Sequence, residues 1–283
     1  MQQTLERHPW NTSFEWATPK GPYRALTDAQ AKQFDEQGFV VLEDVIDLDV
    51  IDAVRAECDV AEAKTDAFLN AQDSGRFSIA ESGAITFSTH LVRRSPVARE
   101  FAAHQLFADL CADLVGPDVN LYWDQAVYKK PEKPRRFPWH QDNGYTFVEP
   151  QQYLTCWVPL TDATIENGCP QVAPELHRLG TITHHYVDPL GWECLSDPDE
   201  VVAAPVRAGG VVVFSSLTPH LTGPNTTGSV RKAYILQYAP DGAEILRGDP
   251  HSGEAPTREP ANDPDRQFAV VRGGERVAPP PIA

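Results

Sequence analysis

The sequence predicts a mainly β protein with packed helices, in which a helical layer is followed by a jelly roll. Helix signals are confined to the chain before Gly116, whereas from Val119 onward short β-like runs alternate with Pro and Gly. Many short strands with such turns favour a jelly roll, an architecture that also protects its sheet edges. The chain has 283 residues, of which 41% are hydrophobic and 23% charged, so a single domain with a sizeable core is expected.

Three helices are expected in the first part of the chain. A capping box at Thr27 begins a helix that Gly38 ends. Asp47 caps the second helix, and Ser95-Pro96 supplies an N-cap and a first-turn proline for a third, which ends before Gly116. Their buried faces are predicted from apolar residues at helical spacing. These residues are Ile51, Val54, Cys58 and Ala61 in the second helix, and Phe101, Leu106, Leu110 and Leu114 in the third.

The strands are predicted from short runs of β-branched, aromatic and other apolar residues. The interval from Asp66 to Gly83 shows neither pattern, and we expect a mobile loop there. The predicted strands are Phe39–Leu42, Val119–Tyr128, Leu154–Val158, Gln171–Val172, Val201–Val206, Val211–Phe214, Ala233–Tyr238 and Gln267–Val271.

These elements divide the chain into three parts. Residues 1–25 are polar and contain proline, which predicts an extended arm. Residues 26–240 form the expected domain, with the helical layer at 26–117 and the jelly-roll core at 118–240. Residues 241–283 are rich in Pro, Gly and charge, and we expect a C-terminal extension that is partly disordered.

Composition excludes several kinds of partner. A net charge of −16 argues against nucleic acid and anionic membranes, and it also disfavours polyanionic acyl-CoA substrates. No apolar run is long enough to cross a membrane or to form a signal peptide near Met1. The five cysteines are odd in number and irregularly spaced, which favours reduced thiols in a cytoplasmic protein. The expected partner is a small-molecule substrate, and the oligomeric state stays open.

A possible metal site is centred on Trp139-His140-Gln141-Asp142. On a strand, His140 and Asp142 would project from the same face and could bind one metal ion, with His220 from a partner strand as the third ligand. Two imidazoles and a carboxylate leave about three coordination positions open, which suits Fe(II) that must take up a cosubstrate and O2. Arg231, expected on the next strand, could bind a dicarboxylate such as 2-oxoglutarate.

These motifs, in this order, resemble the phytanoyl-CoA dioxygenase family. The resemblance covers roughly residues 26–238 and also includes Lys130-Pro131, Asn167-Gly168 and the segment from His220 to Arg231. Members of that family are Fe(II)- and 2-oxoglutarate-dependent oxygenases built on a double-stranded β-helix, the cupin-like jelly roll. The resemblance therefore implies hydroxylation of an unactivated C–H bond, with 2-oxoglutarate converted to succinate and CO2. The acidic net charge favours a small organic metabolite as the substrate.

The resemblance also assigns roles to individual residues. It implies that His140, Asp142 and His220 bind the iron, and that Arg231 and Thr222 bind 2-oxoglutarate. Cosubstrate contacts are also implied for Gln125 and Trp157, although Trp157 could equally belong to the core. His90 is a weaker candidate for a cosubstrate or substrate contact, and His177, at a turn that departs from the family pattern, is not expected to be a ligand. Tyr145, Phe147 and Trp192 are candidate substrate walls, Lys129 and Lys130 are expected at the pocket rim, and His184 and His185 on the surface.

Three alternatives remain open. The same cofactors could support desaturation, epimerisation, cyclisation or hydroxylation of an acyl-CoA, because the outcome depends on which C–H bond faces the metal. A metal-binding jelly-roll protein without turnover would not need Arg231. Neither would a hydrolase or isomerase that uses Zn(II) or Mn(II). In related halogenases a small residue replaces the metal-binding carboxylate, so the presence of Asp142 favours hydroxylation.

Overall fold

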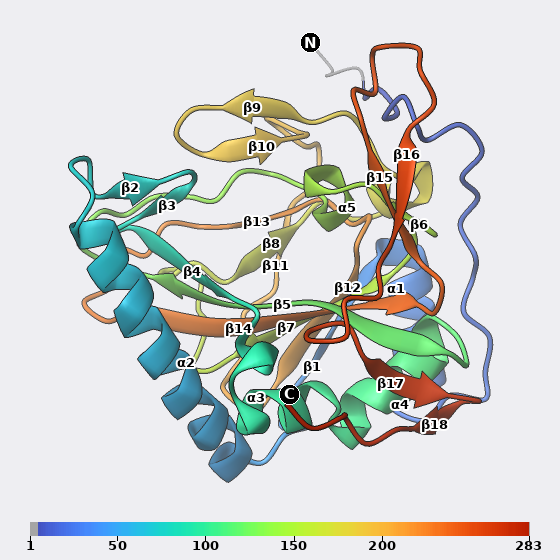
Figure 1. The fold of residues 1–283 in the computed structure, drawn as a ribbon, viewed down its shortest axis with the longest axis horizontal. Coiled ribbons are helices and arrows are strands. Elements are labelled where there is room, and N and C mark those ends of the chain that lie inside the picture. The colour runs from blue at the N-terminus through green and yellow to red at the C-terminus, as the bar shows by residue number, and fades with distance from the viewer. Residues whose placement is uncertain (1–4, 283) are drawn as a thin grey trace.

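The computed structural model describes residues 5–282 and shows two β-sheets that face each other, with helices on the outer side of the larger sheet (Figure 1). All strand pairs within these sheets are antiparallel. This arrangement confirms the predicted jelly roll. The helices are α1 (Asp28–Gln37), α2 (Leu48–Asn70), α3 (Pro96–Ala102), α4 (Gln105–Leu114) and α5 (Asp142–Tyr145), with 3-10 turns η1 (Leu91–Arg93) and η2 (Leu176–Leu179).

The first two helices begin where the sequence predicts them. At α1 the Thr27 side chain accepts from the Gln30 amide, the Gln30 side chain accepts from the Thr27 amide, and Gly38 adopts the left-handed conformation of a C-cap. Asp47 is the N-cap residue of α2, although its side chain makes no capping hydrogen bond. The predicted apolar face of α2 is buried.

Two predictions in the helical layer were wrong. The third helix is in fact two, α3 and α4, because His104 interrupts it and its Nδ1 accepts the Leu106 amide as a new N-cap. As a result Leu106 is only partly buried, whereas the rest of the predicted stripe is fully buried. The interval from Asp66 to Gly83 is not one loop: α2 continues to Asn70, and a short hairpin of two strands follows.

The larger sheet has ten strands in the described chain, with the order β1-β12-β7-β14-β5-β4-β3-β2 and with β17 and β18 attached beside β5. The centre is formed by β14, which pairs with β7 on one side and with β5 on the other. The strands are β1 (Phe39–Leu42), β2 (Arg76–Phe77), β3 (Ala80–Glu81), β4 (Ile85–Thr89), β5 (Val119–Lys129), β7 (Leu154–Pro159), β12 (Val211–Ser215), β14 (Arg231–Pro240), β17 (Ala269–Arg272) and β18 (Glu275–Arg276).

The two faces of this sheet line different interiors. Because strand side chains alternate, Tyr234, Leu236 and Tyr238 of β14 pack against the helices in the main hydrophobic core. Ala233 and Ile235 point the other way, into a second core between the two sheets. Every second side chain of β14 therefore points into the space between the two sheets.

The smaller sheet closes this interior from the opposite side. Its order is β11-β8-β13, and His140 is attached to it through a bridge with His220. Other strands form hairpins and a three-stranded sheet at the periphery (Figure 1). The remaining strands are β6 (Val148–Glu149), β8 (Pro170–Val172), β9 (His185–Val187), β10 (Gly191–Glu193), β11 (Val202–Ala203), β13 (His220–Thr222), β15 (Glu244–Arg247) and β16 (Thr257–Pro260).

The chain beyond residue 240 is more ordered than expected for a partly disordered extension. β17 pairs with β5, and Val270 and Val271 belong to the main core. Arg99 donates hydrogen bonds to the carbonyls of Pro280 and Pro281, so even the proline-rich end packs on α3. These segments complete the main sheet and cover the helical layer.

Residues 5–25 contain no helix and run along the surface of the domain, whereas residues 1–4 of the predicted arm lie outside the described residues. Trp16 packs partly against the main core, and the Gln152 side chain exchanges two hydrogen bonds with the main chain of Ala17. The five cysteines are all buried and free. Within residues 5–282, no helix is both long and apolar enough to cross a membrane.

Candidate metal and cosubstrate site

His140, Asp142 and His220 converge between the two sheets. One ligand atom from each lies within 4.8 Å of the other two, an arrangement that could hold a metal ion. The Asp142 Oδ1 atom is 3.8 Å from His140 Nε2 and 3.9 Å from His220 Nε2. The two histidines are joined by reciprocal main-chain hydrogen bonds of 2.9 Å, so the backbone fixes their relative position.

Asp142 reaches this position by a route that strand periodicity does not describe. His140 forms an isolated bridge, and Asp142 is the first residue of the short helix α5, so the two do not lie on one regular strand. The change of direction after Gln141 brings the carboxylate towards the histidines. The prediction that His140 and Asp142 share a strand face was therefore wrong, although the two side chains do meet.

Main-chain carbonyls orient the two histidine rings. The Nδ1 atoms of His140 and His220 each lie 2.9 Å from a main-chain carbonyl, of Pro138 and Thr218 respectively. A carbonyl only accepts, so each Nδ1 carries the hydrogen and each Nε2 keeps a free lone pair. Burial, and then the neighbouring His220, hold the pKa of His140 well below its usual value, so that ring is neutral and ready to bind a cation.

His184, predicted on the surface, is buried and supports the segment between the ligands. Its Nε2 accepts the main-chain N–H of Gln141 at 2.9 Å, and its Nδ1 lies 2.9 Å from the Ile182 carbonyl. Gly144 packs directly on this ring, where a Cβ atom would lie 2.0 Å from it. The sequence offered no periodic pattern around His184 that would have revealed this role. His185, by contrast, is exposed as predicted.

A cavity of about 500 Å³ contains the triad and the four residues predicted to bind the cosubstrate: Gln125, Trp157, Thr222 and Arg231. Arg231 is 1% exposed, and its Nε and one terminal nitrogen have no hydrogen-bond partner. Its other terminal nitrogen donates to the Val127 carbonyl at 3.3 Å, and its guanidinium lies 5.1 Å from the Trp157 ring centroid. Trp157 therefore belongs both to the core and to the cavity wall.

The burial of Arg231 is energetically unusual. Burial lowers the pKa of Arg231 to about 9. A guanidinium remains charged at neutral pH, so its desolvation is a cost that an incoming carboxylate would offset. Two unsatisfied N–H groups beside a possible metal site therefore fit the distal end of a dicarboxylate such as 2-oxoglutarate.

Lys129, predicted at the pocket rim, is fully buried next to Arg231, its neighbour in the β5–β14 register. Its Nζ donates to the carbonyls of Arg135 (3.1 Å), Thr222 (2.7 Å) and Gly223. The lysine thus fixes the segment that follows His220. Lys130, also predicted at the pocket rim, is not among the residues that line the cavity. It is partly buried and pairs with the carboxylates of Glu62 and Asp66.

The remaining predictions have mixed outcomes. Tyr145 lines the cavity, whereas Phe147 is buried against His8 and Trp10, and Trp192 is exposed beside Tyr186. His90 is not among the residues that line the cavity: its ring packs on Trp123, and its Nδ1 is 3.8 Å from Asp124 Oδ1. His177 is buried, with its Nε2 3.1 Å from the Asp35 carbonyl.

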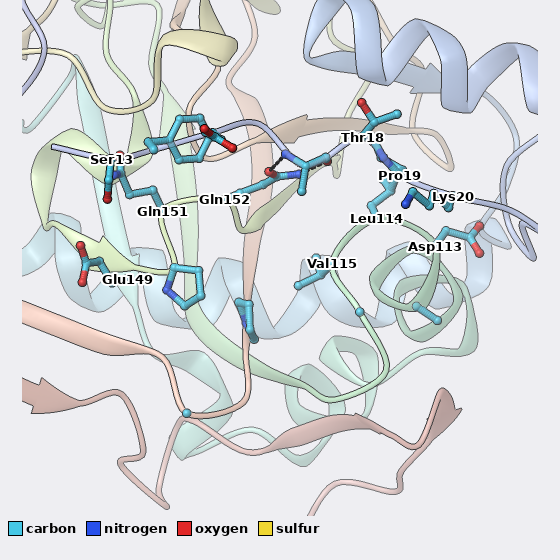
Figure 2. A pocket seen from close by; sticks show the side chains of 18 of the residues that line it. Ser13, Thr18, Pro19, Lys20, Asp113, Leu114, Val115, Glu149, Gln151 and Gln152 are labelled. Carbon is cyan, nitrogen blue, oxygen red and sulfur yellow. Dashed lines mark hydrogen bonds between the residues drawn. The ribbon is translucent and has the colours of Figure 1, made fainter. Parts of the chain in front are cut away.

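A larger, more open hollow of about 850 Å³ lies elsewhere (Figure 2). It separates the N-terminal segment around Thr18–Lys20 from the end of α4 around Asp113–Val115 and from residues 149–152. None of the triad residues lines it. This hollow is larger, but the convergent metal-binding groups make the smaller cavity the candidate functional site.

Comparison with known proteins agrees with this geometry. The family model described as phytanoyl-CoA dioxygenase (PhyH) matches residues 34–233. A methylphosphonate hydroxylase of Gimesia maris is 30% identical over 190 residues, which cover 63% of this chain and 65% of the relative, slightly less than two thirds of its length. An ectoine dioxygenase of Sphingopyxis alaskensis is 28% identical over 239 residues, which cover 75% and 76% of the two chains.

Solved structures show the same architecture. The epimerase SnoN, crystallised with Fe3+, alpha ketoglutarate and nogalamycin RO, superposes with a TM-score of 0.66 at 23% identity, over 86% of this chain and 98% of its own. The alpha ketoglutarate-dependent carbocyclase SnoK gives a TM-score of 0.64 at 25% identity, over 80% and 89%. The family match spans most of the chain, including the triad and Arg231. The chain therefore belongs to the phytanoyl-CoA dioxygenase family and is an oxygenase that depends on iron and 2-oxoglutarate.

Proposed function

We propose that this protein hydroxylates an unactivated C–H bond of a small organic metabolite and couples the reaction to conversion of 2-oxoglutarate to succinate and CO2. The observation that carries the proposal is the pairing of a His-Asp-His cluster with an unsatisfied, buried arginine in one cavity. A metal site alone would serve many chemistries, but a fixed cation beside it selects a dicarboxylate cosubstrate.

In this proposal His140, Asp142 and His220 are the iron ligands. When bound, Fe(II), 2-oxoglutarate and O2 supply the oxidising power for C–H cleavage. The protein holds each ligand atom in place through Pro138, Thr218 and Thr155. Three ligands leave about three positions for the cosubstrate and O2.

Arg231 would bind the distal carboxylate of 2-oxoglutarate. Trp157 stacks on the guanidinium and fixes its plane, while Gln125 and Thr222 offer polar side chains in the same cavity. The enclosing strands exclude water around this cation, which strengthens its attraction for an anion.

Epimerisation and cyclisation are second candidates from the same site. The structural neighbours SnoN and SnoK are named as an epimerase and a carbocyclase. Which outcome follows depends on the substrate carbon that faces the metal. A protein without turnover, or a Zn(II) or Mn(II) hydrolase or isomerase, would leave the buried charge of Arg231 without a purpose.

The site is tested by anaerobic titration of the metal-free protein with Fe(II) and then 2-oxoglutarate, following the weak visible charge-transfer band of the chelate. We expect the band to appear in the wild type and in His185→Ala, a matched control at an exposed histidine, but not in His140→Ala. In air, slow succinate release should accompany the band. Iron binding without a band on addition of 2-oxoglutarate would contradict the proposal and favour a site that binds only the metal.

We also propose a small-molecule partner and a reducing compartment for this enzyme. The net charge of −16 supports a small molecule as partner in preference to nucleic acid or an anionic membrane surface. The five buried, free thiols support a reducing compartment, as in the cytoplasm.

A further inference from the structure

The cavity has two chemically different ends. Along β14, Arg231, Ile235 and Gln237 point into it from the same face, and six residues of strand separate Arg231 from Gln237 by about 20 Å. In the sheet, Gln237 pairs with Trp123 of β5 and with Thr155 of β7, and the Thr155 hydroxyl contacts Asp142. The triad therefore lies near the Gln237 end, and the space beyond it is available to a substrate.

The Gln237 end of the cavity is lined by aromatic side chains, and among the described residues no charged side chain other than those of the triad lines it. Among all the residues that line the cavity, the charged or metal-binding groups are Arg231, Asp142 and the two triad histidines. Each of these is already assigned to the cosubstrate or the metal. Aromatic residues line the cavity on several sides. Trp123 lies next to Gln237 in the strand register, Tyr122 and Tyr153 contact each other, and Tyr145 packs on His140. Phe77 and Phe137 also line the cavity.

The other cations around the cavity pair with carboxylates and do not line it. Arg135 pairs with Glu81 at 3.1 Å and also donates to the Ile79 carbonyl. Arg136 pairs with Glu193 at 2.6 Å. Lys130 pairs with Glu62 and Asp66. Arg266 lies over the Trp123 ring and pairs with Asp263 through Nε. One of its terminal nitrogens has no partner in the described part of the chain, but Arg266 is not among the residues that line the cavity.

Gln237 supplies the contrasting polar group. It is 7% exposed and lines the cavity, and its side-chain amide forms no hydrogen bond with another residue between 5 and 282, so its donor and its acceptor are available to a ligand. A buried amide of this kind stabilises a bound hydroxyl or ketone and gains little from an aliphatic chain.

We propose that the substrate is an uncharged, ring-containing molecule, stacked among these aromatic side chains and hydrogen-bonded through a hydroxyl or carbonyl group to Gln237. The inference rests on the proposed function and deepens it. An anion brought to this end would lose its hydration and meet no cationic side chain among the described residues that line it, so acyl-CoA thioesters, phosphonates and amino-acid-like zwitterions are excluded as substrates. In this respect the chain departs from its methylphosphonate-hydroxylating relative.

The test uses three probes that share one ring system: 2-naphthol, 2-naphthoate and 2-naphthyl phosphate. Each is titrated anaerobically, by calorimetry, into protein loaded with Fe(II) and 2-oxoglutarate, after the charge-transfer band has shown that loading succeeded. We expect 2-naphthol to bind at least about tenfold more tightly than either anion, because only the anions must be desolvated without a partner.

Two substitutions connect this preference to Gln237. Gln237→Leu keeps the side chain's size and should weaken 2-naphthol binding by about fivefold without changing 2-oxoglutarate affinity. Gln105→Leu, at an exposed position on α4, is the matched control and should leave both affinities unchanged. Gln237→Arg should raise 2-naphthoate affinity by at least about tenfold, which would show that the wild-type cavity rejects the carboxylate for its charge and not its size.

The failures of the two proposals are distinguishable. Absence of the band overturns the proposed function before any probe is added. If the band forms, the substrate inference is overturned when an anionic probe binds as tightly as 2-naphthol, when 2-naphthol does not bind, or when neither Gln237 variant changes probe affinity.

Discussion

The Thr155 hydroxyl donates a 2.5 Å hydrogen bond to Oδ2 of Asp142, and this contact determines which carboxylate oxygen faces the histidines. Oδ1, the other oxygen, is the atom that lies 3.8–3.9 Å from the two Nε2 atoms. Thr155 is fully buried on β7, two residues before Trp157. One strand therefore supplies both a support for the metal site and a wall of the cosubstrate site.

Replacing Thr155 by Val should weaken Fe(II) binding by roughly 10- to 100-fold, the usual effect of removing a group that orients a metal ligand. Val preserves the shape, so the fold should survive, as circular dichroism would show. Thr155→Ser restores the hydroxyl and should recover most of the affinity in a competitive chelator titration. Equal iron affinities in all three proteins would remove Thr155 from this role.

Asp142→Ala should abolish hydroxylation, because the site loses its single anionic ligand and its charge balance with Fe(II). Succinate release in the presence of Fe(II) and 2-oxoglutarate is the measurement, and a loss of at least about 100-fold is expected. Asp199→Ala, at an exposed aspartate, controls for the general effect of removing a carboxylate. Turnover that persists in Asp142→Ala would exclude this residue from the triad.

Arg231→Met should separate cosubstrate binding from protein stability. Removal of a buried, unpaired charge should leave the melting temperature of the metal-free protein unchanged or raise it. Affinity for 2-oxoglutarate should fall by about 100-fold, so the cosubstrate should no longer raise the melting temperature of the Fe(II)-loaded protein. Lys232→Met, on the opposite face of β14, should keep that response. A response preserved in Arg231→Met would refute the assignment.

Acid should destabilise the fold through buried neutral histidines, of which His184 has the clearest role. Burial lowers the pKa of His184 from 6.5 to about 4. Between these values the unfolded chain binds more protons than the folded one, so stability falls as the pH drops from about 6.5 towards 4. The loss of unfolding free energy that His184 causes should reach on the order of 2 kcal/mol at pH 5 and about 3 kcal/mol near pH 4.

The measurement is urea unfolding of the metal-free protein between pH 7 and pH 5, compared with His184→Gln. Glutamine can accept the Gln141 amide without taking up a proton, so the variant should show a shallower loss of stability. The same slope in both proteins would mean that His184 does not titrate in this window. His8 and His177, whose pKa values burial also lowers to about 4, should contribute to the remaining loss, as should His140 and His104, whose pKa values burial also lowers.

The sequence predicted the elements whose signals are local. The capping box at Thr27 and the apolar spacing of α2 depend on residues a few positions apart, so α1 and α2 begin where expected. The strands around Val211 and Ala233 were likewise visible as short apolar runs. Motif order was enough to place His140, Asp142, His220 and Arg231 on the list of site residues, and the structure brings all four into one cavity.

What depended on tertiary packing was beyond the sequence. The helix breaks at His104 because its side chain accepts the Leu106 amide and starts a new helix. The spacing of apolar residues does not indicate such a break. Lys129 and His184 were expected at the rim and the surface because their polarity favours water. Both are buried, because carbonyl groups and a main-chain amide from distant segments satisfy them.

The sequence by itself therefore determined the candidate chemistry of this protein: the proposed ligand types, their order and the arginine proposed to bind the cosubstrate. The tertiary structure decided how that chemistry is arranged and what it can act on. Asp142 reaches the metal site from a helical turn, Thr155 orients it from another strand, and distant segments combine to leave an uncharged aromatic space around Gln237. The physical reason is that ligand identity is a property of each residue, whereas orientation, burial and charge pairing arise only between residues far apart in the chain.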